Sequence, residues 1–296
     1  MRNIGPPSPR AAVAGTMQRR ALFTRAVAAV LTAAPLLARG SPATAGTHLR
    51  IGGTGMALAT IREIGSAFTA ANRDVAVDVL PSLGTGGGLN AAAAGAIELA
   101  LSARALNEAE RAKGLHAMAY ARTPVAFAAN SDAGTREITL VQVVQILRGE
   151  LLNWPNGKAI RLIRREPSDA DWSMLRALSP DMTDAIKIAL ERPGLLTVAT
   201  DQENADAIER LPGAVGAMSL GQIRAESRNV VPLTLDSVPP TIEDLAAGRY
   251  KLSRTLYVVW RDKPGVDTAA FIAFLATPPA KDILARLGHI PLAGTT

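Results

Sequence analysis

Cysteine is absent from all 296 residues, and its absence excludes several kinds of chemistry. The chain can form no disulfide, bind no metal through a thiolate, use no cysteine nucleophile and carry no lipid on a cysteine. Histidine is scarce as well: His48, His116 and His289 stand far apart, without the spacing of a zinc site. Neither a Gly-x-Ser-x-Gly motif nor a P-loop lysine is present. We therefore expect a protein that is not an enzyme and that uses no cofactor and no metal.

Acidic residues are missing from residues 1–45, which contain six arginines. Removing those six from the 32 lysines and arginines leaves 26, which equals the 26 aspartates and glutamates of the chain. The formal net charge of +6 therefore belongs to this first segment, and the rest is formally neutral. A strongly basic chain would suggest a nucleic-acid partner, but a neutral body does not.

Residues 1–45 have the pattern of a secretory signal peptide. Arg19 and Arg20 precede an apolar run over residues 27–38, and Ala43-Thr44-Ala45 has the small-x-small pattern of a cleavage site. The run of about 12 residues is too short to span a bilayer, which needs roughly 20. We predict cleavage near Ala45-Gly46 and a periplasmic product.

The export route and the true start of the chain stay open. The paired arginines also resemble a twin-arginine signal, so both the general secretory and the twin-arginine routes remain possible. Met17 would open the signal as naturally as Met1 does.

Strand-like and helix-like segments alternate along the rest of the chain. This order predicts an α/β fold with parallel strands and helices on the sheet faces. In such folds the loops at the carboxyl ends of the strands carry the ligand, and two glycine-rich turns lie at that edge. The expected strands are residues 49–52, 75–79, 97–101, 120–128, 160–163, 213–218 and 256–260, and the expected helices are residues 58–68, 84–94, 140–147, 172–178, 181–190, 205–211 and 268–275.

Several short motifs, taken in order, make residues 49–293 resemble the phosphate-binding family of periplasmic solute-binding proteins. Each motif is weak alone, but their order is fairly specific. The motifs are Gly53-Thr54-Gly55, Ser82-Leu83-Gly84-Thr85-Gly86-Gly87-Gly88, residues 97–104, Tyr120-Ala121-Arg122-Thr123-Pro124, Arg148-Gly149-Glu150 with Asn153-Trp154, Pro212-Gly213-Ala214-Val215-Gly216 and residues 248–254.

The resemblance implies a two-lobed periplasmic-binding-protein fold, type II-like, with an anion in the cleft between the lobes. By similarity, residues 46–122 and 257–296 form lobe one, and residues 123–256 form lobe two. It also implies a substrate-binding component that works as a monomer. Its partners would be inorganic phosphate or a similar oxyanion, and an ABC permease in the inner membrane.

The candidate site consists of hydrogen-bond donors with little bulk, as a tetrahedral oxyanion requires. Helix N-termini supply free N–H groups and partial positive charge, hydroxyls add donors, and an arginine adds a charge-assisted bond. The predicted ligand-binding residues are Thr54, Gly55, Met56, Gly84, Thr85, Gly86, Ser102, Arg104, Arg164, Arg165, Ser168, Asp169 and Ala170.

Two features of this set leave alternatives open. Arg164 and Arg165 are neighbours in a predicted strand, so at most one of them faces the ligand. The family's acidic-Gly-Ser-Gly-Thr run is replaced by Pro167-Ser168-Asp169-Ala170-Asp171, and Ala103 stands where some members have an acid. Asp169 or Asp171 is expected to accept the proton of hydrogen phosphate instead. The alternative functions are a binder of sulfate or molybdate, and a secreted sensor module without a transporter.

Overall fold

The structure is a computed structural model that describes residues 47–295, so the predicted signal segment lies outside the described residues. Residues 47–130 form β1 (Thr47–Gly53), α1 (Gly55–Ala71), β2 (Val75–Val79), α2 (Gly84–Ala93), β3 (Leu99–Ser102), α3 (Glu108–Arg111) and β4 (Leu115–Asn130). Residues 131–219 form a 3-10 turn (Ser131–Ala133), β5 (Glu137–Ile138), α4 (Leu140–Arg148), β6 (Arg161–Leu162), β7 (Arg164–Arg165), α5 (Ala170–Arg176), α6 (Pro180–Glu191), β8 (Thr197–Val198), α7 (Asp201–Arg210) and β9 (Ala214–Ser219). The remainder forms α8 (Leu220–Ala225), β10 (Val230–Pro232), β11 (Thr234–Leu235), α9 (Ile242–Ala246), β12 (Ser253–Arg261), α10 (Val266–Phe274), α11 (Pro278–Arg286) and β13 (Ile290–Thr295).

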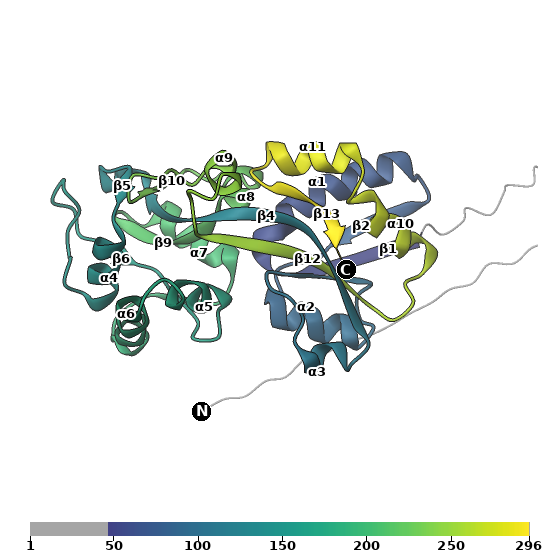
Figure 1. Ribbon diagram of the computed structural model, residues 1–296, viewed down its shortest axis with the longest axis horizontal. Helices are drawn as coiled ribbons and strands as arrows, with labels where there is room; N and C mark the ends of the chain where they lie inside the picture. Colours follow the sequence, from purple (N-terminus) through teal and green to yellow (C-terminus); the bar gives the residue numbers. More distant parts are fainter. Residues whose placement is uncertain (1–46, 296) are drawn as a thin grey trace, which may run out of the picture. The chain divides into compact units, whose positions relative to one another are not determined.

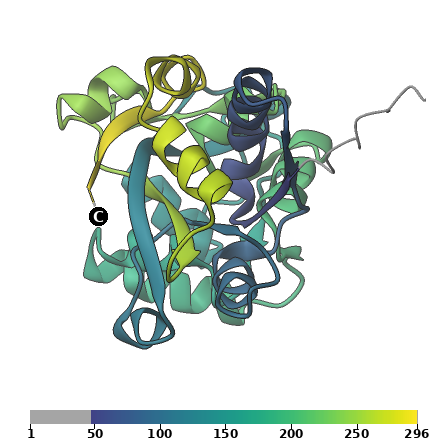
Figure 2. The same ribbon diagram turned by 90° about the vertical axis from the view of Figure 1, so that its right-hand side faces the viewer.

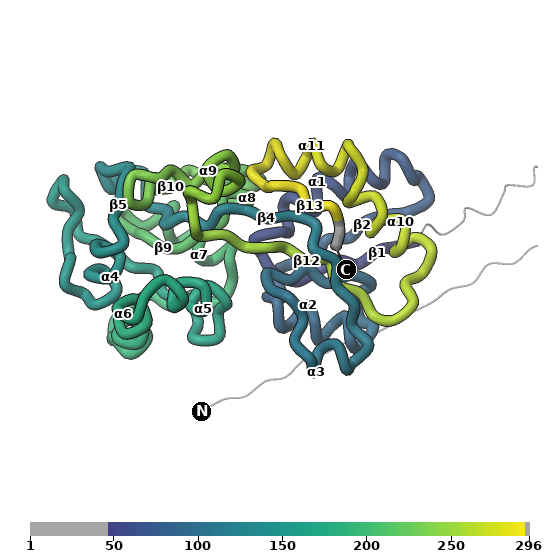
Figure 3. Tube along the Cα trace, in the orientation of Figure 1, coloured from purple at the N-terminus to yellow at the C-terminus, as the bar shows by residue number. Residues whose placement is uncertain are grey.

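A mixed central sheet organises these elements, in the order β2-β1-β3-β12-β4-β9-β6. Strand β1 runs parallel to β2 and β3, whereas β12 runs antiparallel to β3 and β4. Strand β4 continues past this point and pairs antiparallel with β9. Figures 1 and 3 show β4 and β12 running side by side between the two groups of helices.

Buried apolar side chains form two groups of clusters along this sheet. One group draws on residues 49–121 and 256–284, and the other on residues 125–252. Strand β4 contributes to both, passing from one to the other between Ala121 and Val125. We call the two parts lobe one and lobe two, and we propose for them the boundaries predicted from the sequence. In lobe one, α1 and α11 lie on one face of the sheet and α2 on the other (Figures 1 and 2).

The helix expected at residues 205–211 begins earlier, at Asp201. Its start is fixed by a capping box, in which Thr200 accepts from the Glu203 N–H and the Glu203 carboxylate accepts from the Thr200 N–H. The apolar spacing from residue 205 onward did not reveal this polar first turn. The shift brings Asp201 to the first position of α7, next to the N-terminus of α1.

Candidate anion-binding site

A cavity of about 410 Å³ lies between residues of lobe one and lobe two, within the size range of small-molecule sites. Lobe one contributes the loops that open α1 and α2 and the end of β3. Lobe two contributes the segments that open α5 and α7. The lining residues are Thr54, Met56, Ser82, Leu83, Gly84, Thr85, Gly86, Gly87, Ala103 and Arg104 from lobe one, and Arg165, Glu166, Ser168, Asp169, Ala170, Asp171, Ala199, Thr200 and Asp201 from lobe two.

Most of the predicted site residues line this cavity, but Gly55, Ser102 and Arg164 do not. Ser102 is fully buried and closes a local turn, donating from Oγ to the Arg104 carbonyl at 2.6 Å. Gly55 packs against the start of α7 instead. Arg104 lines the cavity, but its guanidinium bonds both carboxylate oxygens of Glu110, at 2.7 and 2.8 Å, so its charge is already paired.

The two neighbouring arginines of β7 point to different surroundings. Arg164 donates from Nη1 to the carbonyls at the end of α6, and from Nε to Thr197 Oγ1 at 2.8 Å. Those carbonyls would otherwise lack partners, because the last turn of a helix leaves them free. Arg164 therefore holds the end of α6, and including it among the ligand-binding residues is not supported by its position.

Arg165 lines the cavity and is buried, with 6% of its surface exposed. Its Nε and Nη2 both donate to Asp169 Oδ2, at 2.9 and 2.6 Å, and its Nη1 donates to the Thr200 carbonyl. Its Nη2 also lies 3.3 Å from Asp201 Oδ1. Burial lowers the pKa of Arg165, but the Asp201 and Asp169 carboxylates outweigh burial and raise the pKa. The guanidinium therefore stays protonated.

Asp169 caps α5 as well as holding Arg165. Its Oδ1 accepts from the Asp171 N–H at 2.8 Å, so each of its oxygens has a fixed partner. In this chain, the segment that replaces the family's acidic-Gly-Ser-Gly-Thr run therefore contains an aspartate that positions the buried Arg165 guanidinium. Ser168, next to Asp169 in the sequence, is exposed and lines the cavity.

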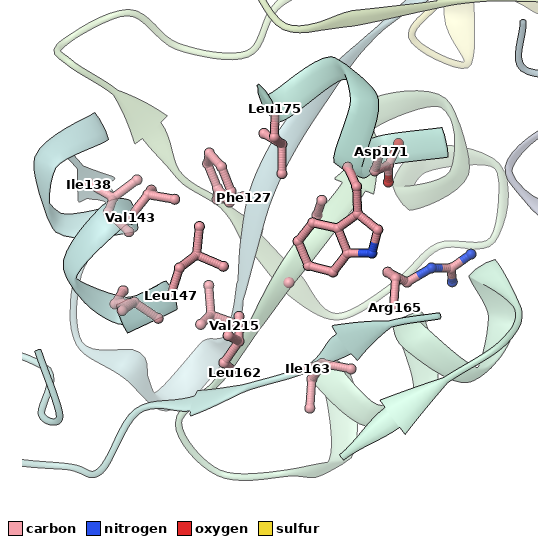
Figure 4. Close-up of a pocket in the computed structure, with 14 residues that line it drawn as sticks. Phe127, Ile138, Val143, Leu147, Leu162, Ile163, Arg165, Asp171, Leu175 and Val215 are labelled. Carbon is pink, nitrogen blue, oxygen red and sulfur yellow. The ribbon is translucent and has the colours of Figure 1, made fainter. Parts of the chain in front are cut away.

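Asp171 forms a buried ion pair with Arg254 of β12, in which Nη2 donates to Oδ1 at 2.8 Å. Burial and the nearby Asp169 carboxylate raise the pKa of Asp171 to about 6, against the opposing effect of Arg254. Figure 4 shows Asp171 and Arg165 at one end of a second, apolar pocket in lobe two, where Phe127, Leu147 and other apolar side chains gather. The Arg165 guanidinium points away from those side chains (Figure 4).

Asp201 is the main cavity residue that the sequence interpretation missed. Its carboxylate bonds lobe one at Thr54 and Met56 and faces Arg165, with 14% of the side chain exposed. Burial is the main reason that the pKa of Asp201 is raised, and the Arg165 charge opposes it. The capping-box pattern at Thr200 and Glu203 was the available signal, because it places the following aspartate at a helix start.

Residues 47–295 contain no group of three or more histidines and acids placed to hold a metal ion. Within the same residues, no helix is both long enough and apolar enough to cross a membrane.

A family model described as a PBP superfamily domain matches residues 38–279. The match covers most of the chain, and the chain belongs to this superfamily. The predicted α/β fold of the periplasmic-binding-protein class is thereby confirmed.

Within this superfamily, the chain is similar to proteins named phosphate-binding proteins. The chain is 24% identical over 201 residues to the phosphate-binding protein PstS of Borreliella burgdorferi, covering 65% of this chain and 72% of the relative. It is 23% identical over 266 residues to PstS of Bacillus subtilis, covering 86% of this chain and 84% of that one. A solved structure described as a phosphate ABC transporter substrate-binding protein of Clostridium perfringens, with bound phosphate, has the same fold. Its TM-score is 0.70 at 19% identity, over 83% of this chain and all of that chain.

Proposed function

We propose that this chain is an exported solute-binding protein that captures a small oxyanion, phosphate foremost, for ABC-type uptake. The observation that carries the proposal is the convergence on one cavity of the starts of α1 and α2 with Arg165 and the start of α5. Helix N-termini and a buried guanidinium are the groups that bind oxyanions best. The relatives named phosphate-binding proteins support the choice of phosphate.

The ligand would be held from both lobes. Thr54 and Thr85 would donate hydroxyls from lobe one, and Arg165 and Ser168 would donate from lobe two. Hydrogen bonds to a charged partner contribute roughly 1.5–3 kcal/mol each. Five or six of them are enough for micromolar binding, after subtraction of the free energy needed to order the ligand and close the lobes. Because the donors come from both lobes, binding would close them about β4 and β12.

Phosphate differs from its rivals in carrying a proton at neutral pH. Asp169 and Asp171 both line the cavity, and each has an oxygen with a lone pair left to accept that proton. These are Oδ1 of Asp169, which also accepts from the Asp171 N–H, and Oδ2 of Asp171, whose other oxygen pairs with Arg254. The same carboxylates repel sulfate and molybdate, which have no proton to donate. Selectivity for phosphate would follow from this repulsion.

The proposal extends to the setting of the protein. Residues 1–45 would direct export and be removed near Ala45-Gly46, and the mature monomer would deliver its ligand to an inner-membrane ABC permease. The superfamily match and the relatives named phosphate-binding proteins support a binding role rather than catalysis.

Isothermal titration of the mature protein against phosphate, sulfate and molybdate tests the function. The expected result is micromolar or tighter binding of phosphate and at least tenfold weaker binding of the other two. Tighter binding of molybdate or sulfate would reassign the ligand. If none of the three anions bound, the oxyanion function would be wrong and a sensor module with another ligand would be favoured.

A further inference from the structure

Asp201 joins the two lobes across the cavity. Its Oδ2 accepts from the Met56 N–H at 2.9 Å and from Thr54 Oγ1 at 3.3 Å, both in lobe one. Its Oδ1 lies 3.3 Å from Nη2 of Arg165 in lobe two. One carboxylate of the protein thus bonds the same kinds of donor that an oxyanion ligand would need.

The position of Asp201 is a natural anion position because two helices begin there. Asp201 is the first residue of α7, and Met56 is the second residue of α1. Both helix starts carry partial positive charge, so a negative group between them stabilises both. The approach is close: a Cβ on Gly55 would lie 2.9 Å from Asp201 Oδ2, and Gln202 Nε2 donates to the Gly55 carbonyl at 3.0 Å.

Asp201 is also the carboxylate that Arg165 holds most loosely. Asp169 receives two bonds from Arg165, at 2.6 and 2.9 Å, and is further fixed by the Asp171 N–H. The contact to Asp201 is a single one at 3.3 Å. An anion that competes for Arg165 would therefore displace Asp201 and leave Asp169 in place.

We propose that Asp201 sets the ligand affinity of this site: its carboxylate occupies an anion position between Met56 and Arg165, and the oxyanion must displace it to bind. This inference rests on the proposed function. The displacement frees three donors at once, the Met56 N–H, the Thr54 hydroxyl and one N–H of Arg165. A displaced carboxylate opposes every oxyanion, whereas a carboxylate that accepts the ligand's proton favours phosphate alone.

The variant Asp201→Asn tests the inference, because asparagine keeps the shape and the acceptor oxygen but loses the charge. Titration calorimetry should show phosphate and sulfate each binding about tenfold tighter to the variant, which is about 1.4 kcal/mol. Asp184→Asn is the matched control, since Asp184 is an exposed acid of α6, and it should bind both anions as the unaltered protein does. Weaker phosphate binding by Asp201→Asn with unchanged or tighter sulfate binding would show that Asp201 accepts the ligand's proton. Unchanged affinity for both anions would also overturn the inference.

Small-angle scattering without ligand gives a readout that does not depend on the oxyanion function. In the unaltered protein the Asp201 carboxylate bonds Met56 and Thr54 of lobe one and contacts Arg165 of lobe two. Asp201→Asn removes the charge of this link, so its radius of gyration should increase. Asp184→Asn should have the radius of gyration of the unaltered protein. If no protein bound phosphate or sulfate, the oxyanion function would fail and scattering alone would decide the role of Asp201. An identical scattering profile for Asp201→Asn would then contradict its role as a link between the lobes.

Discussion

The Asp171 carboxylate and the Arg254 guanidinium form a buried ion pair that ties the first turn of α5 to strand β12. Asp171 is 6% exposed and Arg254 is 8% exposed, so neither charge is solvated by bulk water. Strand β12 lies beside β4, where the chain passes between the lobes. The pair therefore connects the lobe-two side of the cavity to the segment about which we propose that the lobes close.

Arg254→Met should destabilise the protein by about 3–5 kcal/mol at pH 7.5, because it leaves a buried carboxylate without its partner. The loss should be smaller at pH 5. The pKa of Asp171 is already raised to about 6, and loss of the Arg254 charge would raise it further, so the carboxyl would be neutral there. Urea unfolding at the two pH values measures the difference.

Arg249→Met is the control for this comparison, since Arg249 is exposed and pairs with Asp244 at the surface. It should change stability little at either pH. Equal destabilisation by Arg254→Met at both pH values would contradict the assignment of a titrating Asp171.

His289 should make the protein sensitive to acid. Its ring is fully buried, its Nε2 lies 3.0 Å from Thr60 Oγ1, and its Nδ1 has no hydrogen-bond partner among the described residues. Burial lowers the pKa of His289 to about 4. Between about pH 6.5 and pH 4, His289 is therefore protonated in the unfolded chain but neutral in the folded protein. The free energy of unfolding falls by about 3 kcal/mol as the pH falls through that window.

His289→Gln should remove this part of the pH dependence, whereas His116→Gln, at an exposed histidine, should retain it. Thermal or urea unfolding between pH 7.5 and pH 4.5 would show the two slopes. A His289→Gln protein that loses stability as steeply as the unaltered protein would show that the acid sensitivity has another source.

Substitutions of Arg164 and Arg165 should affect different properties, folding stability for Arg164 and phosphate affinity for Arg165. Arg165→Gln should weaken phosphate binding by about 2–5 kcal/mol, because a buried anion would lose its nearest countercharge. Arg164→Gln should leave phosphate binding unchanged but cost about 1.5–3 kcal/mol of folding stability, because the carbonyls at the end of α6 lose a charged donor. Calorimetric titration and urea unfolding on both variants test this, and a larger loss of affinity at Arg164 would reverse the assignment.

The sequence predicted the features that depend on local pattern. The apolar spacing of Leu58, Ile61, Ile64 and Phe68 places all four in the core face of α1. The alternation of side chains along a strand predicted that at most one of the two arginines faces the ligand, and the structure puts Arg165, not Arg164, at the cavity.

The features that the sequence did not reveal depend on contacts between distant segments. Asp201 meets Met56 across 145 positions of sequence, and Asp171 meets Arg254 across 83. No sequence periodicity marks either pair, because each contact forms only when the folded chain brings two distant segments together. The polar first turn of α7 added to the difficulty, since apolar periodicity marks only the later turns.

A crystal structure of the mature protein grown with phosphate would show directly whether this cavity holds an oxyanion against Arg165. We expect a tetrahedral density between the starts of α1 and α2, with one or more oxygens within hydrogen-bond distance of Arg165 and with the Asp201 carboxylate moved off the Met56 N–H. Phosphate bound elsewhere, or bound at this place without contact to Arg165, would contradict the proposed binding site.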